Sequence, residues 1–274
     1  MGSRFEAIDP LEEKLRRKRA DEDDERTVEE TLLSHLDPLL EDRILAEVIR
    51  PIKAGKEAVV YCCRAHESLG GDRVAAKIYR PVERRSFTRD AVYQQGRERG
   101  TRPDARTMRA LGNKTKRGRV HKFNAWIAHE FRTLMLLHQA GADVPAPIER
   151  LGPVILMEYF GDEDRPAPVL VNVTLEEDEA TAIYGQILGN VETFLIGHRV
   201  HADLSAYNML YVNGRIVIID FPQSVDPRYN EDAFDLLLRD LRNVNSYFEA
   251  YDLELVDPLQ HALDIWRAHV DPMR

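Results

Sequence analysis

Apolar and polar residues alternate along the first half of the chain with the period of two that is typical of β-strands. This pattern predicts strands over three segments, residues 49–52, 58–62 and 73–79. Segment 53–57 connects the first two strands, and Gly70-Gly71 predicts a turn before the third. In the third strand, alternation places Lys77 on the same face as the small Ala75.

Later in the chain, apolar residues recur at every third or fourth position, which is the spacing of amphipathic helices. Helices are predicted over four segments, residues 124–141, 176–197, 230–247 and 257–269. In the first helix, Asn124 is a suitable N-cap and Gly141 a suitable stop. Its apolar stripe is predicted to contain Ile127, Phe131, Leu134, Met135 and His138.

Three further elements lie between these helices. Residues 144–148, which contain two prolines, are predicted to form an extended linker, and a strand is predicted over residues 153–159. Strands over residues 209–212 and 215–219 flank Asn213-Gly214, a strong signal for a hairpin turn.

The N-terminal segment has a different composition. Residues 1–26 are dominated by charged side chains, which predicts a disordered or fraying arm. Thr27 and Glu30 form a capping box that opens a helix through Leu32, Leu33 and Leu36. Residues 1–43 are too few to form an independent domain.

Bulk composition is that of an ordinary globular protein. The chain has 274 residues, of which 43% are hydrophobic and 31% charged. No apolar run reaches the length of a membrane span, and the N-terminus lacks the apolar core of a signal peptide. We therefore expect a cytoplasmic protein with no membrane partner. Cys62 and Cys63 are adjacent in a predicted strand and point to opposite faces, which argues against a disulfide or a zinc site.

Charge is unevenly distributed along the chain. The net charge is −9, yet residues 80–122 hold 14 Lys and Arg against 4 Asp and Glu. The overall charge argues against general nucleic-acid affinity, whereas this basic segment is suited to an acidic partner.

The candidate chemistry is concentrated near residues 201–220. Asp203 is followed five residues later by Asn208, and Asp220 closes an apolar strand. The hairpin would hold Asn208 and Asp220 at the same end, where their oxygens suit Mg²⁺ or Mn²⁺ bound to phosphates. Asp203 would then lie beside the attacking oxygen and act as a base or as an orienting group. The alternative is that these residues are ordinary turn and capping residues.

Lys77 and Glu130 form a second candidate pair. Lys77 lies in Val-Ala-Ala-Lys, an arrangement used by nucleotide-binding lobes of kinases, and Glu130 lies beside the stripe residues Ile127 and Leu134. A buried carboxylate needs a partner, and Lys77 is the natural one. Alternatively, Lys77 is a solvated edge residue and Glu130 stays in water.

Together these motifs resemble the RIO family of atypical serine/threonine protein kinases. The resemblance extends from about Ile49 to Tyr247 and rests on four motifs in the right order, Gly55-Lys56-Glu57-Ala58-Val59-Val60-Tyr61, Ala76-Lys77-Ile78-Tyr79-Arg80, His201-Ala202-Asp203-Leu204-Ser205-Ala206-Tyr207-Asn208 and Ile219-Asp220-Phe221-Pro222-Gln223-Ser224-Val225. It implies a bilobal α+β fold of the protein-kinase type. Residues 44–160 would form a nucleotide-binding lobe with an antiparallel sheet, and residues 161–274 a reduced, mainly helical catalytic lobe.

The resemblance also implies roles for individual residues. Asp203 would be the catalytic base, and Asn208 and Asp220 the metal ligands. Asp220 could also accept phosphate as an aspartyl-phosphate. The implied nucleotide contacts are Gly55, Lys56 and Glu57 in the phosphate loop, the pair Lys77 and Glu130 at the phosphates, and Met157, Glu158 and Phe160 at the hinge that pairs with adenine. Ala54 departs from the Ser or Thr usual before the glycine, which weakens one expected phosphate contact.

The implied activity is that of an ATP-dependent kinase or ATPase that phosphorylates itself. Only 54 residues follow Asp220, which leaves little room for a peptide-binding region, so we expect slow turnover that acts as a conformational switch. The family's role in small-subunit maturation implies binding of the pre-ribosomal small subunit or its rRNA through the basic loop 80–122. The N-terminal segment is too short for the winged helix of one RIO branch.

Two other functions remain open. A small-molecule phosphotransferase of the aminoglycoside type also carries a His-x-Asp-x-x-x-x-Asn loop, although the segments Gly55–Ala58 and Ile219–Gln223 disfavour it. A non-catalytic scaffold that binds nucleotide only to order an interface is the second alternative. Every residue needed for the chemistry is present, which argues against a scaffold.

Overall fold

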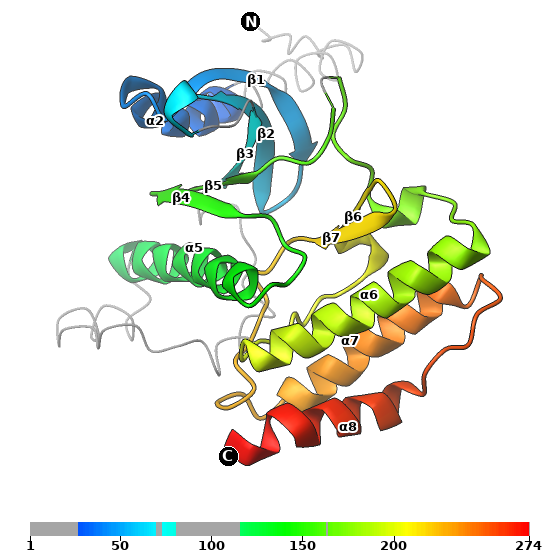
Figure 1. Cartoon of the computed structure of the whole chain (residues 1–274). Coiled ribbons are helices and arrows are strands. Elements are labelled where there is room, and N and C mark those ends of the chain that lie inside the picture. Colours follow the sequence, from blue (N-terminus) through cyan, green and yellow to red (C-terminus); the bar gives the residue numbers. More distant parts are fainter. Residues whose placement is uncertain (1–26, 70–72, 81–115, 163, 274) are drawn as a thin grey trace, which may run out of the picture.

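The computed structural model describes residues 27–69, 73–80, 116–162 and 164–273 (Figure 1). A five-stranded sheet with one long helix forms the first lobe, and a group of helices with a small hairpin forms the second. The α+β, two-lobed arrangement confirms the fold class expected from the sequence. The predicted arm 1–26, the Gly70-Gly71 turn and most of the basic loop 80–122 lie outside the described residues.

The sheet is antiparallel throughout. Its strands are β1 (Leu45–Ala54), β2 (Ala58–Ala65), β3 (Arg73–Tyr79), β4 (Pro147–Leu151) and β5 (Val154–Glu158), in the order β1-β2-β3-β5-β4. β4 begins inside the segment predicted to be a linker. It is a short edge strand with half-exposed residues and a proline at its first position, so it carries little of the apolar alternation that identifies strands.

Each face of the sheet packs against a different partner. Val74, Ala76 and Ile78 on β3 share a core with Leu36 and Leu39 from the N-terminal helices. These helices are residues 27–33, a 3₁₀ turn η1 (Ser34–Leu36) and α2 (Asp37–Glu41). The helix predicted after Thr27 is present, although Leu33 is only half-buried. The opposite face of the sheet carries Ala75, Lys77 and Tyr79 and faces the cleft described below.

Helix α5 (Lys116–Gln139) runs along the first lobe and is longer than predicted. It begins before Asn124, so Asn124 is not its N-cap, and residues 116–122 of the predicted basic loop are helical. Ile127 and Leu134 are buried as expected, whereas Met135 and His138 are exposed and Leu137 is buried instead. The sequence pattern therefore gave the element correctly but misplaced its start and part of its buried stripe.

The second lobe contains α6 (Glu177–Ile196), α7 (Ala233–Phe248) and α8 (Pro258–His269), close to the predicted bounds. The hairpin of β6 (Met209–Val212) and β7 (Arg215–Ile218) confirms the predicted turn, because Asn213 and Gly214 both adopt positive φ, 51° and 81°. Four short 3₁₀ turns complete the described elements: η2 (Glu67–Leu69), η4 (Leu170–Asn172), η5 (Ala206–Asn208) and η6 (Asp271–Met273). None of the helices in the described ranges has the length and apolar character needed to cross a bilayer.

Candidate active site

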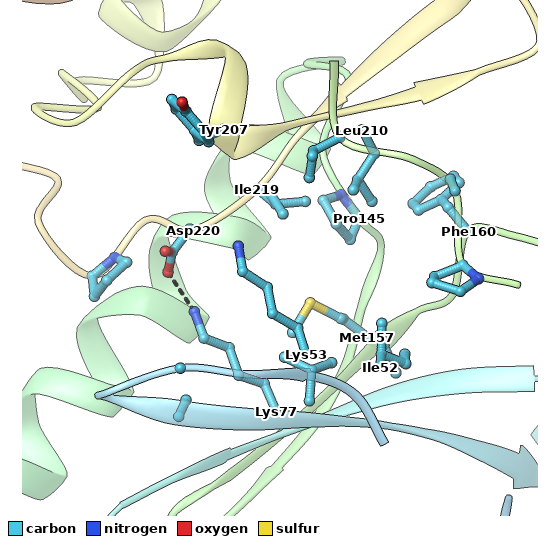
Figure 2. A pocket seen from close by; sticks show the side chains of 18 of the residues that line it. Ile52, Lys53, Lys77, Pro145, Met157, Phe160, Tyr207, Leu210, Ile219 and Asp220 are labelled. Carbon is cyan, nitrogen blue, oxygen red and sulfur yellow. Dashed lines mark hydrogen bonds and ion pairs between the residues drawn. The ribbon is translucent and has the colours of Figure 1, made fainter. Parts of the chain in front are cut away.

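A cleft of about 720 Å³ lies between the two lobes, lined by residues from both (Figure 2). Ten of the eleven residues predicted for the site line it: Gly55, Lys56, Glu57, Lys77, Glu130, Met157, Glu158, Phe160, Asp203 and Asp220. Asn208 is the exception. These ten residues are separated by up to 165 positions in the sequence, and the fold brings them to one place.

One part of the cleft is apolar. Val60, Ala75 and Met157 line it from the sheet. Leu210 of β6 and Ile219, the residue after β7, line it from the second lobe. The Phe160 carbonyl accepts a hydrogen bond from the Ala167 N–H at 2.9 Å, whereas the Phe160 N–H has no acceptor within the described residues. Two apolar walls with a backbone donor at their edge suit a flat heteroaromatic ring.

Lys77 occupies the polar end of the cleft. It lies on β3, in the middle of the sheet, and is 8% exposed. Its ammonium contacts the Glu130 carboxylate at 2.7 Å and the Asp220 carboxylate at 2.6 Å. The predicted Lys77–Glu130 pair is thus confirmed, and neither residue is the solvated side chain that the alternative required. The contact to Asp220 joins the two lobes through one side chain.

The opposite charges of Lys77 and its two carboxylate partners favour the charged form of each group. Burial alone would lower the pKa of Lys77, but the Asp220 and Glu130 carboxylates outweigh it and hold the pKa above its ordinary value. Burial raises the pKa of Glu130, and the Lys77 ammonium counteracts this effect. For Asp220, burial also disfavours the charged form, yet Lys77 is strong enough to lower the pKa. Asp220 is therefore ionised at neutral pH.

The backbone at Asp220 explains how its side chain reaches Lys77. Asp220 follows β7 with φ of 74°, a left-handed conformation that is uncommon for residues other than glycine. The Ile219 N–H donates to the Asn208 carbonyl at 2.9 Å, which fixes the strand end beside the loop that carries Asp203. Ala202 in that loop also has positive φ, 66°. Such backbone strain is found preferentially at functional sites.

Asp203 and Asn208 are hydrogen-bonded neighbours. The Asn208 amide nitrogen donates to the Asp203 carbonyl at 2.9 Å and lies 3.5 Å from its carboxylate. Burial and then the nearby Asp220 raise the pKa of Asp203. Although Asn208 does not line the cleft, its nitrogen faces Asp203, and its Oδ1 is the atom left to bind a cation.

These oxygens fit a hard divalent cation. The described residues contain no group of three or more His, Cys, Asp or Glu arranged to hold a metal by themselves. Asp220 and Asn208 instead supply a carboxylate and an amide oxygen, the ligand types that Mg²⁺ and Mn²⁺ prefer. Mg²⁺ is typically held by one or two protein oxygens together with substrate phosphates. The donor set therefore suits an ion that arrives with a nucleotide.

Asp240 was not predicted from the sequence, yet it holds the loop that carries Asp203. Asp240 lies on α7, is buried, and accepts the Ala202 N–H at 2.7 Å and the Leu204 N–H at 3.0 Å. Burial raises its pKa to about 7. The signal was available, because Asp240 stands three residues after Leu237 and four before Val244, within the apolar stripe of α7. A carboxylate in such a stripe needs buried donors.

His201 packs against aromatic side chains next to this loop. Its ring lies 4.6 Å from the Phe221 ring and 6.4 Å from the Phe194 ring, measured between centroids. Its Nε2 lies 3.2 Å from the Ile219 carbonyl oxygen, and we assign it as the donor. Burial lowers the pKa of His201 from 6.5 to about 4. The imidazole is therefore neutral in the folded protein and cannot serve as a cation at neutral pH.

This shift predicts a pH-dependent loss of stability. Because the pKa is lower in the folded state, the unfolded chain binds an extra proton between pH 6.5 and about pH 4, and stability falls as the pH falls through this window. Between pH 7.5 and pH 5.5 the His201 contribution to the free energy of unfolding should fall by about 1 kcal/mol. Urea unfolding of the protein and of His201→Gln, which keeps an N–H donor, measures the difference. Equal pH slopes would contradict the assignment.

The chain is similar to several known proteins. The family model for the RIO domain matches residues 59–260. Human serine/threonine-protein kinase RIO1 is 34% identical over 261 residues, which are 91% of this chain and 43% of the human protein. The chain spans about half the length of the curated relatives it matches.

Two crystal structures of the Rio2 kinase from Chaetomium thermophilum have the same fold. One superposes with a TM-score of 0.62 at 20% identity, covering 85% of this chain and 66% of Rio2. The other, of the Rio2 kinase–ADP/Mg²⁺–phosphoaspartate complex, gives a TM-score of 0.57 at 19% identity and covers 84% and 65% of the two chains. At this identity the similarity concerns the fold alone.

Proposed function

Because the chain belongs to the RIO domain family, we propose that it is an ATP-dependent serine/threonine kinase or ATPase that works in the cleft between the lobes. One observation carries the proposal. The Lys77 ammonium is held between Glu130 and Asp220 at 2.7 and 2.6 Å, beside Asp203 and next to an apolar pocket suited to adenine. A cation fixed in this way can position phosphates without side-chain rearrangement.

The residues that line the cleft suggest how ATP would bind. The apolar walls, which include Val60 on one side and Ile219 on the other, would hold adenine. The segment Gly55–Glu57 would approach the phosphates together with Lys77. Arg80 donates to the Gly55 carbonyl at 3.0 Å and so fixes the loop. Asn208 and Asp220 would hold Mg²⁺ or Mn²⁺, which when bound neutralises phosphate charge.

The chemical step needs a base beside the attacking oxygen. Asp203 lines the cleft and has a raised pKa, so its carboxylate is more basic than an ordinary aspartate. It would accept the proton from a hydroxyl or water as that oxygen attacks the terminal phosphorus and the bond to ADP breaks. His201 is neutral and buried, and its role is to support the loop.

We extend the proposal to autophosphorylation and to a switch-like use of slow turnover. Only residues 221–232 separate Asp220 from α7, which leaves a short segment where a peptide substrate would bind. The Asp220 carboxylate, which lies in the cleft at Lys77, is a candidate phosphate acceptor. The Rio2 complex mentioned above contains a phosphoaspartate, which is a precedent in a relative of the same fold.

The partner proposal rests on charge alone. The basic segment 80–122 carries a large excess of Lys and Arg, which suits rRNA of the small ribosomal subunit. Binding to small-subunit particles should weaken steeply with salt and after neutralising Arg97, Arg99 and Arg102. Salt-independent binding would contradict this partner.

The central test is phosphate release from ATP with Mg²⁺, measured with self-labelling by radioactive γ-phosphate. We expect both to require Asp203, so Asp203→Ala should lose them, whereas Asp252→Ala on an exposed loop should not. Nucleotide binding without hydrolysis or transfer would favour the scaffold. Transfer to an aminoglycoside-like small molecule but never to protein would favour the small-molecule phosphotransferase.

A further inference from the structure

Lys53 is a third lysine in the cleft, besides Lys56 and Lys77, and it has no role in the predicted site. It is the penultimate residue of β1, and its exposed side chain lines the cleft. Figure 2 shows the side chain extending from the β1 side, with its amine directed toward the side of the cleft where Asp220 lies. Within the described ranges, neither a hydrogen bond nor an ion pair is made by this amine. It is therefore available to a ligand.

A β-bulge places Lys53 on this face of the sheet. Pro51 pairs with Tyr61, so an unbroken register would pair Lys53 with Val59, which belongs to the core on the other face. A register shift between Pro51 and Lys53 pairs Lys53 with Val60 instead, and Val60 lines the cleft. Cross-strand partners project on the same face. The extra residue therefore redirects the Lys53 ammonium into the cleft.

The charge balance of the polar end calls for another cation. The Lys77 ammonium already contacts the Glu130 and Asp220 carboxylates. The whole lining holds three lysines, Lys53, Lys56 and Lys77, against five acidic residues, Glu57, Glu130, Glu158, Asp203 and Asp220. A polyphosphate entering the cleft meets excess negative charge that Lys53 can offset.

We propose that Lys53 binds the terminal phosphate of the nucleotide, on the β1 side of the cleft, and so makes the protein prefer ATP over ADP. This inference rests on the proposed function. Lys53 then supplies a charge-assisted hydrogen bond at the end of β1, where Ala54 offers no hydroxyl. The phosphate that is transferred is held by Lys53 and Lys77 together, and ADP leaves more readily because it lacks that phosphate.

The test compares the nucleotide affinities of variants of the 274-residue chain. Calorimetry with Mg²⁺ would measure binding of a non-hydrolysable ATP analogue and of ADP to the protein, Lys53→Ala and Lys53→Arg. We expect Lys53→Ala to weaken the ATP analogue about tenfold, the size of one charge-assisted hydrogen bond, and ADP by less than about twofold. Lys53→Arg, which restores the cation, should recover most of the loss.

Arg64→Ala is the matched control. Arg64 lies on β2 at the opposite end of the β1–β2 pair, where it contacts Glu47 in solvent, and its loss removes one positive charge from the same sheet. We expect it to change neither affinity. Equal loss of both nucleotides in Lys53→Ala, or no loss, would overturn the inference while leaving the proposed function in place. Failure of the unmodified protein to bind either nucleotide would overturn both.

Discussion

Replacing Asp220 with Asn should reduce phosphate release and transfer on the order of 10³-fold, the size of effect seen when one preorganised electrostatic group is removed from an active site. Asn keeps the size of the side chain but loses the charge that contacts Lys77 at 2.6 Å and that would hold the divalent ion. Steady-state ATP turnover with Mg²⁺ measures the effect.

The fold should survive this substitution, because Lys77 keeps its second partner, Glu130. Asp252→Asn provides a control of identical chemistry on an exposed loop, and we expect its turnover to equal that of the unmodified protein. If the Asp220→Asn protein has unchanged thermal unfolding and nearly full turnover, Asp220 takes no part in the reaction.

Asp240→Ala should be the most damaging substitution for stability. It leaves the buried Ala202 and Leu204 N–H groups without their acceptors, which lie at 2.7 and 3.0 Å in the intact protein. Each unsatisfied buried donor costs about 1–3 kcal/mol, so the loss of two acceptors should lower the free energy of unfolding by about 2–6 kcal/mol. Urea unfolding at neutral pH measures the loss. Turnover should fall as well, because Asp203 lies between the two residues that Asp240 fixes.

Two companion variants separate this role from a general effect of changing α7. Asp240→Asn keeps one carbonyl acceptor and should give an intermediate loss. Asp235→Ala makes the same change at an exposed position in the first turn of α7 and should cost less than about 1 kcal/mol. If Asp235→Ala and Asp240→Ala lose equal stability, the hydrogen bonds to the loop are not the cause.

Local sequence patterns were sufficient for several parts of the site. Alternation alone placed Lys77 on the inner face of β3, and helical spacing placed Glu130 beside a buried stripe. The pair then followed from the cost of burying an unpaired carboxylate. The Asn213-Gly214 turn likewise fixed a hairpin that ends at Asn208 and Asp220.

Other parts depend on tertiary structure or on breaks in a pattern. The contact between Asp240 and the loop at Ala202 joins residues 38 positions apart, and only the packing of α7 brings them together. Lys53 reaches the cleft through a bulge, which a period-two pattern cannot anticipate. The start of α5 was missed because residues 116–122 are mostly polar and basic, so the apolar periodicity that marks a helix begins only later.

The helices that precede β1 pack against one face of the five-stranded sheet. Leu32, Leu36 and Leu39 are buried there against strand residues that include Tyr61 and Ile78. A shortened protein that starts at β1 would keep every residue of the cleft and yet present this apolar surface to water. Large exposed apolar patches promote self-association. Any engineered form intended to stay monomeric must therefore retain residues 27–43, although none of them lines the cleft.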